Sequence, residues 1–106
     1  MVAFQELADL LARSTGAEAA LDQALAGGFA VPVEDFTASV DAARRLAVAA
    51  LPGWKFHVGY DAGGMFPYAA LTLDDLHVEA SAPTVPLAIL RAAVAAKLRQ
   101  EAASAP

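Results

Sequence analysis

Seven side chains are candidates for contact with a small ligand, because of their chemistry and their positions in the sequence. Four of them lie at expected helix starts. Phe36, Thr37 and Ser39 precede one apolar stripe, and Thr84 precedes another. The unpaired N–H groups and the dipole at a helix start attract a phosphate or another anion. Capping of the helix by the hydroxyl is the first interpretation, because most helices need such a residue, and anion binding is the alternative.

The other three side chains are candidates for contact with a nucleotide-like ligand. Arg91 falls within the apolar stripe that includes Leu87 and Val94. Its guanidinium there needs an anionic ligand, a subunit contact, an acidic partner or a path to water. Trp54 and Tyr68 offer flat rings that could stack on a purine-like base. For Trp54 the first interpretation is a place in the core, and stacking on a ligand is the alternative.

The titratable residues do not indicate a reaction. His57 and His77 lie on the polar sides of two expected strands, which a meander would place about 9 to 10 Å apart, too far for one metal ion. The pair Asp74-Asp75 falls in an expected turn, where aspartate favours local hydrogen bonds. No Ser-His-Asp order, phosphate-binding loop or dinucleotide fingerprint is present. We therefore expect no enzyme, no metal and no cofactor.

Composition limits the classes of partner. The chain of 106 residues suits one domain over residues 1–106, and its 58% hydrophobic but 8% aromatic content favours closely packed, alanine-rich helices. A net charge of -5 disfavours binding to extended nucleic acid but leaves a small anionic ligand open. Glu6 and Asp9 interrupt the first apolar run, which makes this segment unlike a signal peptide. No stretch of the sequence is apolar enough to cross a membrane. The absence of cysteine suits the cytosol.

Apolar residues at helical spacing predict four helices. Ser14 or Thr15 is the expected cap of the second helix, and residues 103–106 are an expected frayed tail. The first helix is expected from Phe4 to Ser14, and the second from there to Gly27-Gly28. The third is expected from Thr37 to Pro52-Gly53, and the fourth from Thr84 onward.

Alternating residues after the third helix predict a sheet. Trp54, Phe56, Val58 and Tyr60 face one side of the first strand, and the segments 65–73 and 76–81 follow as further strands. Pro67 lacks an N–H group and indicates an edge position or a bulge. The expected fold is α+β, with a three-stranded antiparallel β-meander packed between helices in the order α-α-α-β-β-β-α.

Three segments carry a family resemblance: "ARSTGAEAALDQALA", "FTASVDAARRLAVAALPGWKF" and "ASAPTVPLAILRAAVAAKL". With Phe36-Thr37, Gly53-Trp54 and the run from Thr84 to Ala93, they resemble small proteins of tailed bacteriophages and prophages, in particular the phage ABA sandwich family. The likeness covers most of the chain. It implies an alpha/beta/alpha sandwich and an accessory role for a phage in the cytoplasm of its bacterial host, but no reaction.

Two functions fit this resemblance. Some small phage proteins are sponges that sequester cyclic or ADP-ribose-type nucleotides made by immune systems such as CBASS and Thoeris. By analogy with that class, the first hypothesis is an anti-defence sponge, acting as a homo-oligomer with its nucleotide-like ligand near subunit interfaces. The second hypothesis is an interaction module that binds a host or phage protein through its sheet or an exposed helix face.

Overall fold

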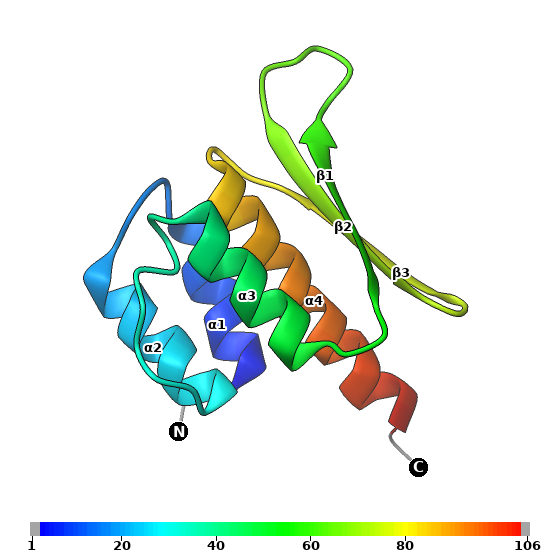
Figure 1. The fold of residues 1–106 in the computed structure, drawn as a ribbon, viewed down its shortest axis with the longest axis horizontal. Helices are drawn as coiled ribbons and strands as arrows, with labels where there is room; N and C mark the ends of the chain where they lie inside the picture. Colours follow the sequence, from blue (N-terminus) through cyan, green and yellow to red (C-terminus); the bar gives the residue numbers. More distant parts are fainter. Residues whose placement is uncertain (1–2, 105–106) are drawn as a thin grey trace.

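The apolar stripes fold as helices and the alternating segments fold as one sheet, in the order expected from the sequence (Figure 1). The computed structural model describes residues 3–104. The predicted α+β class is confirmed, as are the antiparallel meander and the order of its elements. The elements are α1 (Phe4–Arg13), α2 (Ala19–Phe29), α3 (Val40–Ala50), β1 (Lys55–Tyr60), β2 (Pro67–Leu73), β3 (Leu76–Ser81) and α4 (Val85–Ser104).

The last helix, α4, forms the centre of the molecule. Helices α1 and α3 and strands β2 and β3 all pack against it. Four of its alanines, Ala88, Ala92, Ala93 and Ala96, have no exposed surface. Their small side chains allow neighbouring elements to approach α4 from several directions, and this explains how an alanine-rich chain with few aromatic residues fills its core.

The sheet has the strand order β1-β2-β3, with both neighbouring pairs antiparallel. Pro67 is therefore the first residue of the central strand, and the predicted edge position or bulge is wrong. A proline is tolerated there because the bond that it cannot donate lies at the end of a ladder. Its carbonyl still accepts from the Ala82 N–H at 3.2 Å.

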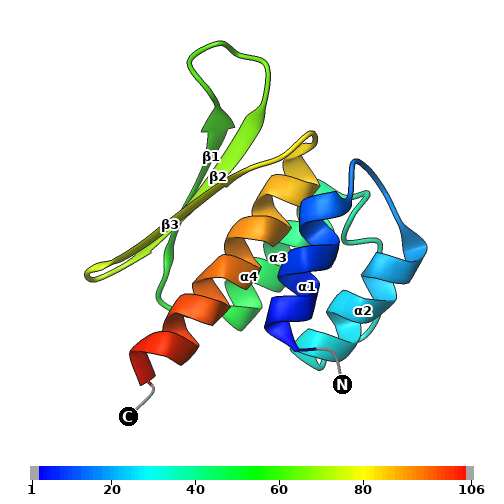
Figure 2. The same cartoon turned by 180° about the vertical axis from the view of Figure 1, so that it is seen from behind.

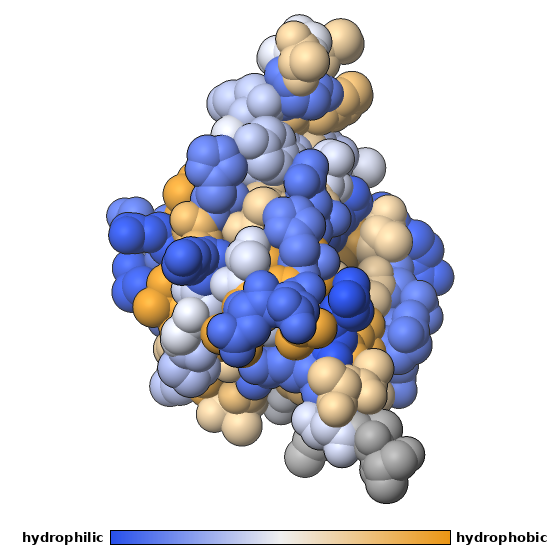
Figure 3. Space-filling view, turned by 90° about the vertical axis from the view of Figure 1, so that its right-hand side faces the viewer, coloured by the Kyte–Doolittle hydropathy of each residue, from blue (hydrophilic) through white to orange (hydrophobic). Residues whose placement is uncertain are grey.

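The molecule has two layers, one of helices and one of strands (Figures 1 and 2). Phe56 and Val58 point toward the helix side, whereas His57 and Glu79 point outward and are exposed. The expected placement of the sheet between helices is therefore wrong in one respect: within residues 3–104, no helix covers the outer face. The polar outward positions explain this arrangement, because they gain little from burial. Figure 3 shows mainly hydrophilic side chains on this side of the molecule.

Several helix ends differ from the sequence expectation. Helix α2 begins after Glu18, without the predicted cap from Ser14 or Thr15. It passes through Gly27-Gly28 and ends at Phe29, and the capping residue Ala30 that follows has a left-handed φ of 57°. The N–H group of Ala30 donates to helix carbonyls and closes the last turn, so hydrogen bonding, rather than a glycine, ends the helix.

At the C-terminus, α4 continues to Ser104. The predicted frayed tail is thus helical at residues 103–104, and residues 105–106 lie outside the described residues. Over the described part of the chain, no helix has the length and the apolar character needed to cross a membrane.

Candidate functional site

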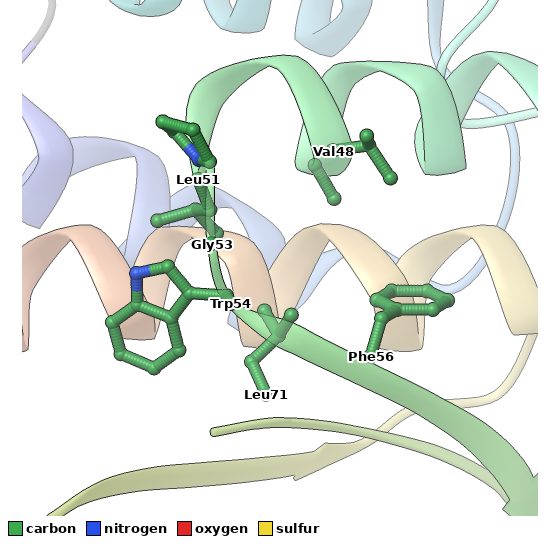
Figure 4. Close-up of a pocket in the computed structure, with 8 residues that line it drawn as sticks. Val48, Leu51, Gly53, Trp54, Phe56 and Leu71 are labelled. Atoms are coloured by element: carbon green, nitrogen blue, oxygen red, sulfur yellow. The ribbon is translucent and has the colours of Figure 1, made fainter. Parts of the chain in front are cut away.

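An apolar cavity lies where α3 ends and β1 begins (Figure 4). Its volume is about 260 Å³. It forms because α4 packs under β2 and β3, while the inner face of β1 extends beyond that contact. The cavity is lined by Ala47, Val48, Leu51, Pro52, Gly53, Trp54, Phe56 and Leu71.

Trp54 is one wall of this cavity and is only 9% exposed. The chain reaches it through Gly53, whose left-handed φ of 86° turns the backbone from α3 into β1. The indole Nε1 is buried and has no hydrogen-bond partner among residues 3–104. Such a group costs about 1 to 3 kcal/mol. The structure therefore places Trp54 in the core, with one face available to a molecule in the cavity.

Tyr68 lies on the outer face of the sheet, away from the cavity. Its hydroxyl is 3.0 Å from Nε2 of His57, and the two ring centroids are 5.7 Å apart. The ring lies over Gly59, where a Cβ atom would be only 3.2 Å from it. Gly59 thus makes room for the aromatic pair, which is a feature that the sequence analysis missed.

His77 lies on the same outer face, on β3. Its Nδ1 is 3.0 Å from the Thr72 hydroxyl, and its Nε2 is 3.5 Å from a carboxylate oxygen of Glu79. Both side chains of the ion pair are 57% exposed, so the contact contributes little to stability. The described residues contain no group of three or more side chains that could hold a metal ion.

Thr37 is buried in a hydrogen-bond network and does not cap α3. Its hydroxyl accepts from the Glu18 N–H at 2.8 Å and lies 2.8 Å from an oxygen of Asp22. The same carboxylate oxygen accepts from the Thr37 N–H at 2.8 Å. These bonds join the start of α2 to the segment before α3. The predicted Thr37 cap is wrong because Thr37 lies too far before the first turn of α3.

The true cap of α3 is Ser39, whose hydroxyl accepts from the Ala42 N–H at 3.1 Å. Phe36 is 1% exposed and belongs to the core. Thr84 precedes α4 as predicted, and its hydroxyl accepts from the Leu87 N–H at 3.4 Å. The hydroxyls of Ser39 and Thr84 are thus both used by their own helices.

Arg91 donates to backbone carbonyls, and no carboxylate among residues 3–104 contacts it. Its Nε donates to Leu11 at 3.0 Å, and its terminal nitrogens donate to Ser81 at 2.9 Å, Ser14 at 3.1 Å and Ala12 at 3.4 Å. These bonds use four of the five N–H groups of a guanidinium. Burial lowers the pKa of Arg91, the direction expected for a cation that loses water without gaining an acid. The group holds the end of α1 against the end of β3.

The seven predicted residues do not meet in one site. Ser39 and Trp54 lie beyond opposite ends of α3, which is about 16 Å long at the usual rise per residue. Tyr68 lies on the outer face of the sheet, and Arg91 is engaged at the end of α1. A ligand that touched all of them would have to span the molecule.

The loop between β1 and β2 projects beyond the helix layer (Figure 1), and the sequence analysis missed that the two residues before Pro67 belong to it. Met65 and Phe66, assigned above to a strand, lie in this loop and are 75% and 48% exposed. We call these two residues the hairpin tip. The available signal was the occurrence of large apolar residues directly after Gly63-Gly64, where polar residues are usual.

Comparison of the chain with protein-family models, curated proteins and solved structures gives no match. The resemblance to phage proteins therefore stays a prediction.

Proposed function

We propose that the chain is a non-enzymatic interaction module of a phage or prophage, which binds a host or phage protein in the cytoplasm of the bacterial host. The observation that carries this proposal is the hairpin tip, where Met65 and Phe66 are exposed on a projecting loop. Large apolar side chains that gather on a surface commonly mark an interaction site. Phenylalanine supplies contact area, and methionine adapts to the shape of a partner.

The loop that carries the hairpin tip is ordered by local hydrogen bonds. The Asp61 side chain accepts from the Met65 N–H at 3.1 Å, and the Asp61 carbonyl accepts from Gly64 at 2.9 Å. A loop that is ordered before binding loses less entropy when it meets a partner. Residues 61–66 contain no cationic side chain, so their chemistry favours an apolar recess in a protein over a nucleic acid.

Photo-crosslinking in bacterial cells tests the interaction module. A benzophenone amino acid at position 65 should form a defined adduct with one partner, and Phe66→Ser in the same chain should abolish it. The matched control places the crosslinker at Val33, which is 58% exposed and lies between α2 and α3. No adduct at position 65, or the same adduct at both positions, would contradict the proposal.

The nucleotide sponge is a second candidate, favoured by the cavity beside Trp54. A cavity of about 260 Å³ with an indole wall can hold one flat ring. No cationic side chain lines it, so a phosphate would have to lie outside it. The sponge therefore fits less well than the interaction module.

Incubation with cyclic dinucleotides and cyclic ADP-ribose isomers tests the sponge. A sponge should deplete free ligand, return it intact on heating, and change the emission of Trp54, the only tryptophan. Val48→Phe should narrow the cavity and reduce the depletion, whereas Val40→Phe on the same helix should not. Conversion of the ligand to a product would indicate an enzyme, and no depletion would exclude the sponge for this panel.

A further inference from the structure

The outward edge of β1 carries a defined set of free backbone groups. The Asp61 N–H donates to the Phe66 carbonyl at 3.0 Å, so the backbone groups of Asp61 point toward β2. In an antiparallel ladder such residues alternate with residues whose N–H and C=O groups point the other way. The outward groups therefore belong to Phe56, Val58 and Tyr60.

The bond at Pro67 supports the same assignment independently. The Pro67 carbonyl accepts from the Ala82 N–H, so its backbone points toward the β3 side. Tyr60, which is paired with Pro67, must then point its own backbone groups away from β2. Within residues 3–104, no hydrogen bond engages the outward groups of β1.

We infer that β1 pairs antiparallel with β1 of a second copy of this chain across a two-fold axis at Val58. The axis joins the two three-stranded sheets into one continuous sheet. Only residues with outward backbone groups can form the bonded pairs of this ladder. The register with the greatest overlap joins Val58 to Val58, and Phe56 to Tyr60 of the second copy. This inference does not depend on the proposed function.

The side chains of β1 are complementary to those of a second β1 strand, and this favours a second copy of the chain as the partner at this edge. In the register centred on Val58, Lys55 of each copy lies opposite Asp61 of the other on the outer face. Both side chains are exposed. On the inner face, Tyr60 of one copy lies opposite Phe56 of the other copy. Tyr60 is 60% exposed, and Phe56 lines the cavity. Opposite charges and aromatic pairs at facing positions are favourable in a sheet, and the two-fold axis forms each pair twice.

Disulfide trapping tests the register, because the chain has no cysteine of its own. In Val58→Cys, the two Cα atoms should lie about 5.5 Å apart, within the range for a disulfide. Mild oxidation of the purified variant should therefore give a covalent dimer. His77→Cys on the opposite edge is the control, because that side chain is more exposed and random collision would favour it. Faster crosslinking of His77→Cys, or none of Val58→Cys, would overturn the inference.

Sedimentation equilibrium tests the non-covalent dimer. The wild-type chain should be dimeric at about 100 μM. Lys55→Glu should weaken the dimer roughly tenfold, because it places like charges opposite each other twice. Lys97→Glu changes the net charge equally but lies on α4, so it should leave the dimer unchanged. A wild-type monomer at this concentration, or equal effects of the two substitutions, would overturn the inference.

Discussion

At the β3 edge of the sheet, two arginines of α4 donate to outward carbonyl groups, whereas no described residue does so at the β1 edge. Arg91 meets the Ser81 carbonyl at 2.9 Å and Arg99 meets the His77 carbonyl at 3.5 Å. An open edge invites pairing with another strand, and proteins commonly cover or charge the edges that must stay unpaired. The comparison shows that arginines of α4 occupy outward carbonyl groups of β3, whereas the edge of β1 stays open to pairing with another strand.

Arg91→Met is expected to have the largest effect on stability, because it removes the arginine that makes the shorter hydrogen bond to the β3 edge. The carbonyls of Leu11, Ser14 and Ser81 would lose a charged donor. We expect a loss of about 2 to 4 kcal/mol in the free energy of unfolding, measured by urea titration. A change below about 0.5 kcal/mol, together with weaker partner or ligand binding, would instead support the functional role predicted from the sequence.

Val58→Pro should have the next largest effect, because it removes an N–H group from the open edge in both copies. We expect the dimer dissociation constant to rise about 50-fold, while the melting temperature of the monomer changes little. Val58→Thr retains the N–H group and the branched side chain, and serves as the control. A Val58→Pro variant that dimerises as well as the wild type would place the interface elsewhere.

Gly59→Ala should have a smaller effect, on the outer face of β1. The added Cβ would lie 3.2 Å from the Tyr68 ring and displace it from His57. We expect a destabilisation of about 0.5 to 1 kcal/mol, since the reduced flexibility of the unfolded chain offsets part of the strain. Gly63→Ala is the control, because its Cβ would meet only an ordinary contact at 3.7 Å. Equal stability of the two variants would show that the Tyr68 ring moves without cost.

Arg99→Met should have the smallest effect. Its contact with the His77 carbonyl is 3.5 Å long and exposed, so we expect less than about 0.5 kcal/mol in the urea titration. The difference between the stability losses of Arg99→Met and Arg91→Met then measures how unequally the two arginines of α4 stabilise the two ends of β3. A loss as large as that of Arg91→Met would mean that both ends are held equally.

The sequence predicted the elements well because their signals are local. Apolar spacing along Val85–Ser104 and alternation from Trp54 to Tyr60 depend on neighbours within a few residues. The partners of Thr37 and Arg91 could not be predicted in this way. Thr37 bonds to residues 15 and 19 positions away, and Arg91 reaches back to the end of α1, up to 80 positions away.

The candidate site was predicted less well than the fold. Trp54 was correctly singled out as a ring with a place in the core, but its cavity depends on the gap between α3 and β1. That gap follows from tertiary packing. The free edge of β1, in contrast, follows from the predicted meander, in which the first strand is an edge strand, although Pro67 argued against a central place for β2.

Helix α2 should be the first part of the molecule to open, because the bonds between Thr37 and Asp22 are among its few attachments to the rest of the domain. Helix α2 packs mainly on α1, and besides this interface the network at Thr37 connects it to the segment before α3. A segment with so few attachments opens without unfolding the rest of the domain. Amide protons of α2 should therefore exchange with deuterium well before those of α4, and Asp22→Ala should speed exchange in α2 alone.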